Sequence, residues 1–207
     1  RQRQMCIRDS SYLLSDDEIE MLTVVRKHFK KVVLLLNVGN IIDMTDINRI
    51  APDSVLYVWQ GGMTGGKGTA DVLTGKVSPS GKLPDTIAYK ASDYPSDANF
   101  GREENRDIYA EDIYVGYRYF ETFAKDKVLY PFGFGLSYTG FEIKTEKAEI
   151  TEGAVKLSVS VKNIGSYKGK EVIEVYCEAP QGRLGKAARV LCGFEKTREL
   201  VPQEEQM

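Results

Sequence analysis

The run at residues 61–67 is the chain's closest match to a known chemical motif. It reads GGMTGGK, which matches the first seven positions of a phosphate-binding loop, and it stands between a predicted strand and a predicted helix. The eighth position of such a loop must be Ser or Thr to hold magnesium, and here it is Gly68. We therefore interpret the run as a glycine turn that brings the helix close to the strand, and we expect no nucleotide site.

Adjacent carboxylates occur at Glu103-Glu104 and at Glu111-Asp112. Paired carboxylates can act as acid and base at a glycosidic bond, but a retaining enzyme needs them about 5–5.5 Å apart, with one pKa raised. The side chains of sequence neighbours usually point apart, which favours acidic loop residues. We therefore assign no catalytic residue.

The single histidine, His28, excludes a zinc site built from several histidines and leaves one candidate for a Ser-His-Asp triad. It lies in the basic stretch 26–31, which is typical of a solvated helix. We expect no metal and no cofactor.

Two residues are candidates for substrate binding, Trp59 and Asp43. Ligands of open α/β sheets bind beyond the carboxyl ends of the strands, and Trp59 is predicted to end one strand while Asp43 lies beyond the end of the other. Trp59 could equally be a core or interface aromatic residue, and Asp43 could cap the turn that follows it.

The elements that position these residues follow a helix–strand–helix–strand–helix pattern, which predicts an α/β layer with a parallel sheet. A capping box at Ser15 and Glu18 begins a helix that runs to about Lys31. Apolar runs near 32–37 and 55–59 predict buried parallel strands. A short helix is expected at 69–73, and the few strands indicate part of a larger α/β sandwich domain.

Residues 77–138 contain four prolines and many aromatic residues, and they show little periodicity. We expect an ordered excursion that packs on its own aromatic side chains.

From residue 141 the apolar period becomes two, which predicts antiparallel strands. Val155, Leu157, Val159 and Val161 should share one buried face, and further strands are expected at 173–177 and 189–194. A sandwich of this type needs about 100 residues, and only 67 remain, so we expect a truncated immunoglobulin or fibronectin III-like domain. Cys177 and Cys192 are expected to be buried free thiols.

Composition excludes several classes of protein. The net charge of −2 gives no basic footprint for nucleic acid, and the longest apolar run of five residues cannot span a membrane. Three cysteines, an odd number, indicate free thiols and favour the cytoplasm, although a secreted or periplasmic location stays open. Residues 1–10 resemble adapter-derived sequence and are set aside, which leaves expected domains at 11–140 and 141–207.

Several ordered motifs resemble the C-terminal part of glycoside hydrolase family 3, the β-glucosidase and β-xylosidase family. They are VWQGG at 58–62, ADVLTGKVSPSGKLP at 70–84, YVGYRYF at 114–120 and YPFGFGLSYT at 130–139. VSVKNIG at 159–165, GKEV at 169–172 and LCGFEK at 191–196 resemble its fibronectin III-like domain. One departure is the absence of proline from the usual Trp-x-Pro-Gly pattern at residues 59–62.

The resemblance implies a parent enzyme built from a TIM-like barrel, an α/β sandwich and a fibronectin III-like domain. Such enzymes hydrolyse β-linked glycosides or oligosaccharides with retention, using a barrel aspartate and a sandwich glutamate. Both are expected upstream of the matching residues, so this chain alone should be inactive. The alternatives are a carbohydrate-binding module and a structural interaction domain.

Overall fold

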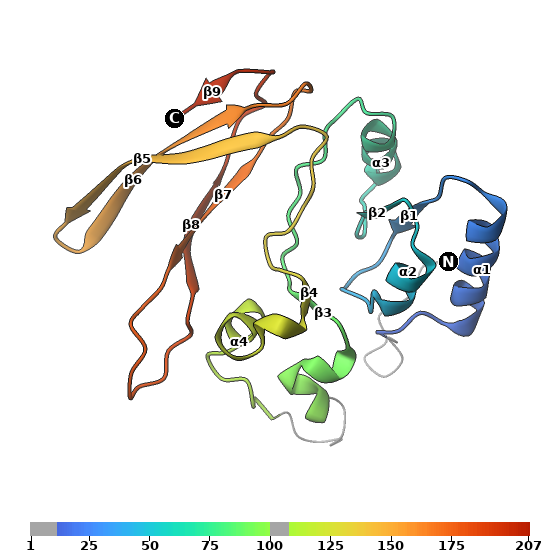
Figure 1. Ribbon diagram of the computed structural model, residues 1–207, viewed down its shortest axis with the longest axis horizontal. Coiled ribbons are helices and arrows are strands. Elements are labelled where there is room, and N and C mark those ends of the chain that lie inside the picture. Colours follow the sequence, from blue (N-terminus) through green and yellow to red (C-terminus); the bar gives the residue numbers. More distant parts are fainter. Residues whose placement is uncertain (1–11, 100–107) are drawn as a thin grey trace. The chain divides into compact units, whose positions relative to one another are not determined.

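A computed structural model describes residues 12–99 and 108–207 (Figure 1). The predictions for residues 1–10, Glu103 and Glu104 lie outside these ranges. The chain divides into two compact units. The described part of the first comprises 12–66, 84–99, 108–132 and 179–189, and the second comprises 67–83, 133–178 and 190–207. These units divide the chain at different points from the expected boundary at 140, which stays a prediction.

The first helix, α1 (Asp16–His28), begins at the predicted capping box. The Glu18 amide donates to Ser15 Oγ (3.4 Å), and the Ser15 amide donates to Glu18 Oε2 (2.8 Å). The helix ends at His28, so the predicted end near Lys31 was three residues too late. Lys31 instead donates to Asp53, at 3.0 Å.

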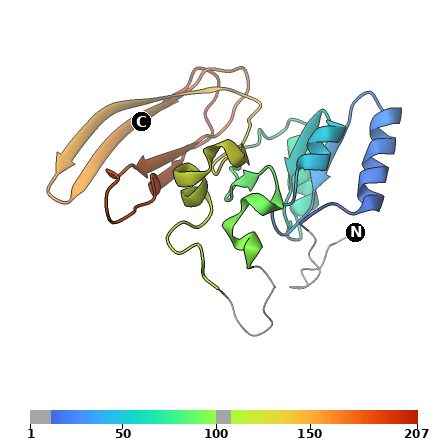
Figure 2. The ribbon, with the colours of Figure 1, turned by 60° about the horizontal axis from the view of Figure 1, so that its bottom comes forward.

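The predicted parallel strands are confirmed as β1 (Val33–Leu36) and β2 (Ser54–Tyr57), joined by α2 (Thr45–Ile50). The prediction that β1 is buried on both faces was wrong, because Val33 is 52% exposed and Leu35 is 40% exposed, whereas Leu36 is buried. Alternate residues of a strand face opposite sides, so only one face of this sheet is covered within its unit. The helices α1 and α2 contact each other beside the sheet (Figure 2).

Helix α3 (Gly65–Leu73) begins four residues before the predicted helix at 69. Gly65, Gly66 and Gly68 are therefore helical rather than part of a turn. Gly61 allows the chain to double back closely, since a Cβ there would lie 2.8 Å from the Gly65 Cα.

Within the first unit, residues 84–99 and 108–132 of the aromatic excursion pack on their own aromatic side chains, as predicted. The excursion contains the antiparallel pair β3 (Ile87–Ala88) and β4 (Val128–Tyr130), the helix α4 (Tyr117–Phe123), and the 3₁₀ turns η1 (Ala91–Asp93), η2 (Pro95–Ala98) and η3 (Lys125–Lys127). Its core consists of Ala88, Phe120 and Ala124, with Tyr94, Tyr119 and Val128 packed against it. The Tyr94 and Phe120 rings meet edge to face, with centroids 5.4 Å apart.

Residues 179–189 belong to the same unit and pack on α4. The Ala188 amide donates to Thr122 Oγ1 (3.0 Å), and Arg189 pairs with Glu121 (3.6 Å). Ala187 is buried.

The second unit contains the predicted antiparallel strands. The first sheet has the order β5 (Phe141–Thr151), β6 (Ala154–Asn163) and β9 (Glu205–Gln206). The second pairs β7 (Val172–Cys177) with β8 (Val190–Lys196). The fibronectin III-like arrangement of these strands stays a prediction.

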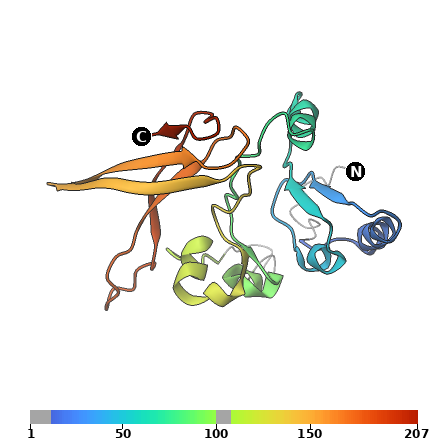
Figure 3. The same ribbon diagram turned by 45° about the horizontal axis from the view of Figure 1, so that its top comes forward.

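The predicted buried face of β6 is correct only near the carboxyl end of the strand. Val161 is 2% exposed, whereas Val155 is 62% exposed and Leu157 is 37% exposed. The β5–β6 hairpin extends beyond the other elements of its unit, so nothing there covers its tip (Figure 3). Cys177 and Cys192 are free, as expected, but both are exposed, which corrects the prediction that they are buried.

Candidate functional site

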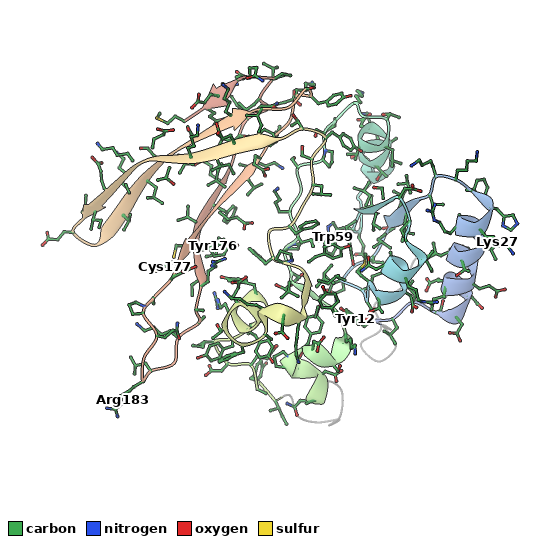
Figure 4. All side chains as sticks on the ribbon, in the orientation of Figure 1. Tyr12, Lys27, Trp59, Tyr176, Cys177 and Arg183 are labelled. Atoms are coloured by element: carbon green, nitrogen blue, oxygen red, sulfur yellow. The ribbon has the colours of Figure 1, made fainter. Side chains whose placement is uncertain are left out.

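The carboxyl ends of β1 and β2 lie side by side and form the candidate site. The Val58 amide, one residue beyond β2, still donates to Leu36 O, at 2.9 Å. The strand ends at Tyr57, two residues before the predicted end at Trp59, so Trp59 lies just outside it. It is half-buried next to β2 (Figure 4), and its backbone φ is +55°. The site therefore presents an indole on a constrained turn.

Tyr57 supports Trp59 and joins the two strand ends. Its ring centroid lies 5.0 Å from that of Trp59. The Tyr57 hydroxyl accepts from the Ile42 amide (3.2 Å) and donates to Met44 Sδ (3.8 Å). Burial raises the pKa of Tyr57 to about 12, so the hydroxyl stays protonated near neutral pH. Tyr57 was not predicted as a site residue, although it lies two positions before Trp59 at the end of the same strand.

Asp43 lies in the loop after β1, at the same end of the sheet, but its carboxylate has a structural partner. The side chain is buried, and its Oδ1 accepts from the Thr45 amide, at 2.7 Å. The Asp43 amide donates to Tyr12 O, at 2.8 Å. The loops carrying Asp43 and Trp59 meet through the bond between Ile42 and Tyr57. This geometry matches the turn-capping alternative for Asp43.

Two tyrosines that were not predicted from the sequence, Tyr12 and Tyr94, support the loop that carries Asp43. The hydroxyls of Tyr12 and Tyr94 lie 3.2 Å apart. The Tyr94 hydroxyl also accepts from the Ala88 amide (2.9 Å) and lies 3.0 Å from Thr86 O, to which it donates. Burial is the largest cause that raises the pKa of both Tyr12 and Tyr94. These groups are structural hydrogen-bonding partners rather than acids or bases at neutral pH.

The remaining sequence candidates occupy ordinary positions. Lys67, from the run that resembles a phosphate-binding loop, pairs with Asp71 one helical turn later, at 2.5 Å. His28 is exposed, with Nδ1 2.8 Å from Val24 O. Asp112 is exposed and has φ +48°.

No group of three or more His, Cys, Asp or Glu side chains in residues 12–99 and 108–207 could hold a metal ion. None of the helices in those ranges has the length and apolar character required to cross a membrane.

Comparison with known proteins identifies the class. Residues 7–138 match the C-terminal domain of glycosyl hydrolase family 3, and the chain belongs to this family.

The similar proteins are β-glucosidases. The chain is 65% identical to a β-glucosidase of Ruminococcus albus, over 95% of this chain and 20% of that protein. It is 46% identical to β-glucosidase A of Butyrivibrio fibrisolvens, over 94% of this chain and 26% of that protein. A β-glucosidase structure from Paenibacillus barengoltzii is 54% identical, with a TM-score of 0.90, over 95% of this chain and 22% of that one. The chain thus spans about a fifth to a quarter of these relatives.

Proposed function

We propose that this chain is part of a retaining β-glucosidase that removes terminal β-linked glucosyl residues. The observation that carries the proposal is the 65% identity to a β-glucosidase across 95% of the chain. The motifs at 58–84, 114–120 and 130–139 support the same assignment.

The catalytic carboxylates are proposed to come from parts of the parent protein outside this chain, including a TIM-like barrel. Several acidic side chains of this chain are engaged in supporting the fold. Asp43 holds the turn after β1, Asp53 binds the start of β1, and Glu171 pairs with Lys82 at 2.7 Å. None of these three is a free acid or nucleophile of the kind that a retaining glycosidase requires.

Within this chain, Trp59 is the proposed substrate contact. Its half-buried indole lies at the end of the parallel sheet and is held by the Tyr57 ring. An aromatic face of this kind can pack against the apolar face of a sugar ring. The carboxylate of Asp43 instead stabilises the adjacent loop. The strands from β5 to β9 are proposed to form a fibronectin III-like support domain.

A domain exchange tests the proposed function. The matched segment of the Ruminococcus albus enzyme is replaced by residues 12–207, and this chimera is compared with the isolated chain on nitrophenyl β-glucoside and β-xyloside. We expect the chimera to hydrolyse the glucoside and the isolated chain to remain at background. A folded but inactive chimera would contradict the proposal, as would an isolated chain with a rate near that of the chimera. A chimera that prefers the xyloside would retain the class and change the substrate.

A further inference from the structure

Arg118 carries a cation that has no counter-charge in the described chain. It is the second residue of α4, and its Nε atom is buried without a hydrogen-bond acceptor. Within residues 12–99 and 108–207, no carboxylate forms an ion pair with its guanidinium. Arg118 as a whole is half-buried, and a buried N–H donor without an acceptor is unfavourable, so this arrangement requires an explanation.

The acidic residue best placed to pair with Arg118 is already engaged. Glu121 lies three positions further along α4, a spacing at which helical side chains can meet. Its carboxylate instead pairs with Lys125 (3.3 Å) and Arg189 (3.6 Å). Among residues 12–99 and 108–207, the guanidinium is therefore left without a counter-charge, although the helix carries a carboxylate.

Aromatic rings hold the guanidinium in place. The Arg118 Cζ atom lies 5.8 Å from the centroid of the Tyr117 ring, and that ring packs on Phe132 with centroids 4.8 Å apart. A cation over an aromatic face keeps a defined orientation, which lowers the cost of binding an anion. The side chain is thus partly preorganised before any partner arrives.

Several apolar side chains close to Arg118 in the sequence are exposed. Ile113 and Val115, in the segment leading into α4, are 46% and 55% exposed, and Phe123 at the end of α4 is 61% exposed. The Tyr114 and Phe123 rings, 4.8 Å apart, join this segment to the helix. Exposed apolar side chains gathered near a polar anchor are typical of an interaction surface.

We propose that Arg118 binds a carboxylate of the parent protein that lies outside this chain, and that the apolar residues around it complete that contact. The planar guanidinium can hold a carboxylate through two parallel hydrogen bonds. The remainder of the parent is the expected partner, because the relatives are several times longer than this chain. The inference rests on the proposed function, since it takes the partner to be the rest of a β-glucosidase.

The test compares Arg118→Met in the chimera and in the isolated chain. In the chimera, the substitution leaves the partner carboxylate unpaired, so we expect the thermal unfolding midpoint to fall by about 3 °C or more. In the isolated chain it removes a cation that pairs with none of the described carboxylates, so the midpoint should stay the same or rise. Arg183→Met is the matched control, because Arg183 lies at the exposed tip of the 179–189 loop (Figure 4), and it should change neither midpoint.

If the isolated chain shows no cooperative unfolding transition, a second measurement on the chimera alone tests the proposal. Arg118→Ala should lower the midpoint of the chimera, and added guanidinium ion should restore it for this variant only.

Three results would overturn the proposal. The first is a chimera whose unfolding midpoint does not change with Arg118→Met. The second is a chimera whose midpoint falls equally with Arg183→Met. The third is an equal drop in the unfolding midpoint of the isolated chain for Arg118→Met and for the double variant Glu103→Gln/Glu104→Gln. The counter-charge would then lie within this chain. These readouts use stability, so they are separate from the activity that tests the proposed function.

Discussion

Trp59 has a backbone conformation that a bulky residue rarely adopts. Its φ of +55° lies in the left-handed region, which residues other than Gly, Asn and Asp rarely adopt. The contact with Tyr57 helps to hold this conformation. Strain of this kind often persists where function requires a side chain in one position, which agrees with the substrate contact proposed for Trp59.

Trp59→Ala in the chimera should lower kcat/KM on nitrophenyl β-glucoside by about 10-fold, which corresponds to about 1.4 kcal/mol of transition-state stabilisation. The loss is expected because Ala offers no ring face to the sugar. Trp59→Phe should retain part of the activity. Tyr109→Ala is the control, because Tyr109 is 90% exposed, and it should leave kcat/KM unchanged. Steady-state kinetics of the three variants decides whether the indole contributes to turnover.

Asp53 joins α1, β1 and β2 through one carboxylate. It accepts from the Val32 amide (2.9 Å), from Lys31 Nζ (3.0 Å) and from Arg26 Nη1 (3.1 Å). The amide of Val32, followed by Lys31, lowers the pKa of this carboxyl below its usual value. The folded state therefore favours the ionised form of Asp53.

This lowered pKa predicts a dependence of stability on pH. The contribution of Asp53 is present above the unfolded pKa, about 4, and is lost as the pH falls through the lower folded pKa. Asp53→Asn should therefore be less stable than the wild-type chain at pH 7, and the difference should narrow below about pH 4. Asp126→Asn, at an exposed position, is the control and should follow the wild-type curve. Thermal unfolding between pH 3 and pH 7 measures the effect, and a constant difference across that range would contradict it.

Helix α2 ends at a residue that is poorly suited to its conformation. Ala51 is the C-cap, with φ 55° and ψ 64°, and its amide donates to Ile47 O, at 3.0 Å. Glycine adopts this left-handed conformation without the steric cost of a Cβ.

Ala51→Gly should therefore raise the free energy of unfolding by about 0.5 kcal/mol, since part of the steric gain is offset by the greater freedom of glycine in the unfolded chain. Ala70→Gly, within α3, is the matched control and should cost about 1 kcal/mol. Urea unfolding of the chain distinguishes the two signs. Destabilisation by both substitutions would show that the conformation of Ala51 is not strained.

The elements that the sequence predicted well depend on local chemistry. The capping box at Ser15 determined the start of α1, and the apolar runs located β1 and β2. The extent of burial was harder to predict, because the alternation in β6 shows which residues share a face but not how far along the strand that face is covered. The early start of α3 was missed because glycines disfavour a helix unless tertiary contacts support it, and such contacts cannot be seen in a local pattern.

Trp59 and Asp43 became candidates because Trp59 ends one apolar run and Asp43 lies in the loop after the other. Tyr12 and Tyr94 were missed, because their hydroxyls meet across 82 positions of sequence and no local pattern indicates that contact. Arg118 was missed because a lone arginine in a motif is unremarkable until the structure shows that no carboxylate in the described ranges pairs with it.

At the scale of the whole chain, one face of the two-stranded parallel sheet is uncovered within its unit. Val33 and Leu35 lie on that face and are 52% and 40% exposed, although both were expected to be buried. Exposed apolar strands promote association between chains, and the remaining domains of a longer protein would cover such a face. The same side chains should therefore have opposite effects in the isolated chain and in the chimera.

A Val33→Thr/Leu35→Thr variant tests this reversal, because threonine is β-branched and suits a strand while making the face more polar. In the isolated chain, we expect less concentration-dependent association, measured by light scattering. In the chimera, we expect a lower unfolding midpoint, because the hydroxyls would be buried without partners. Ile150→Thr, at a position 88% exposed on the β5–β6 hairpin, controls for a general gain in solubility and should leave the chimera unchanged. Less association of the isolated chain together with a higher unfolding midpoint of the chimera would show that this face stays open to solvent in the longer protein.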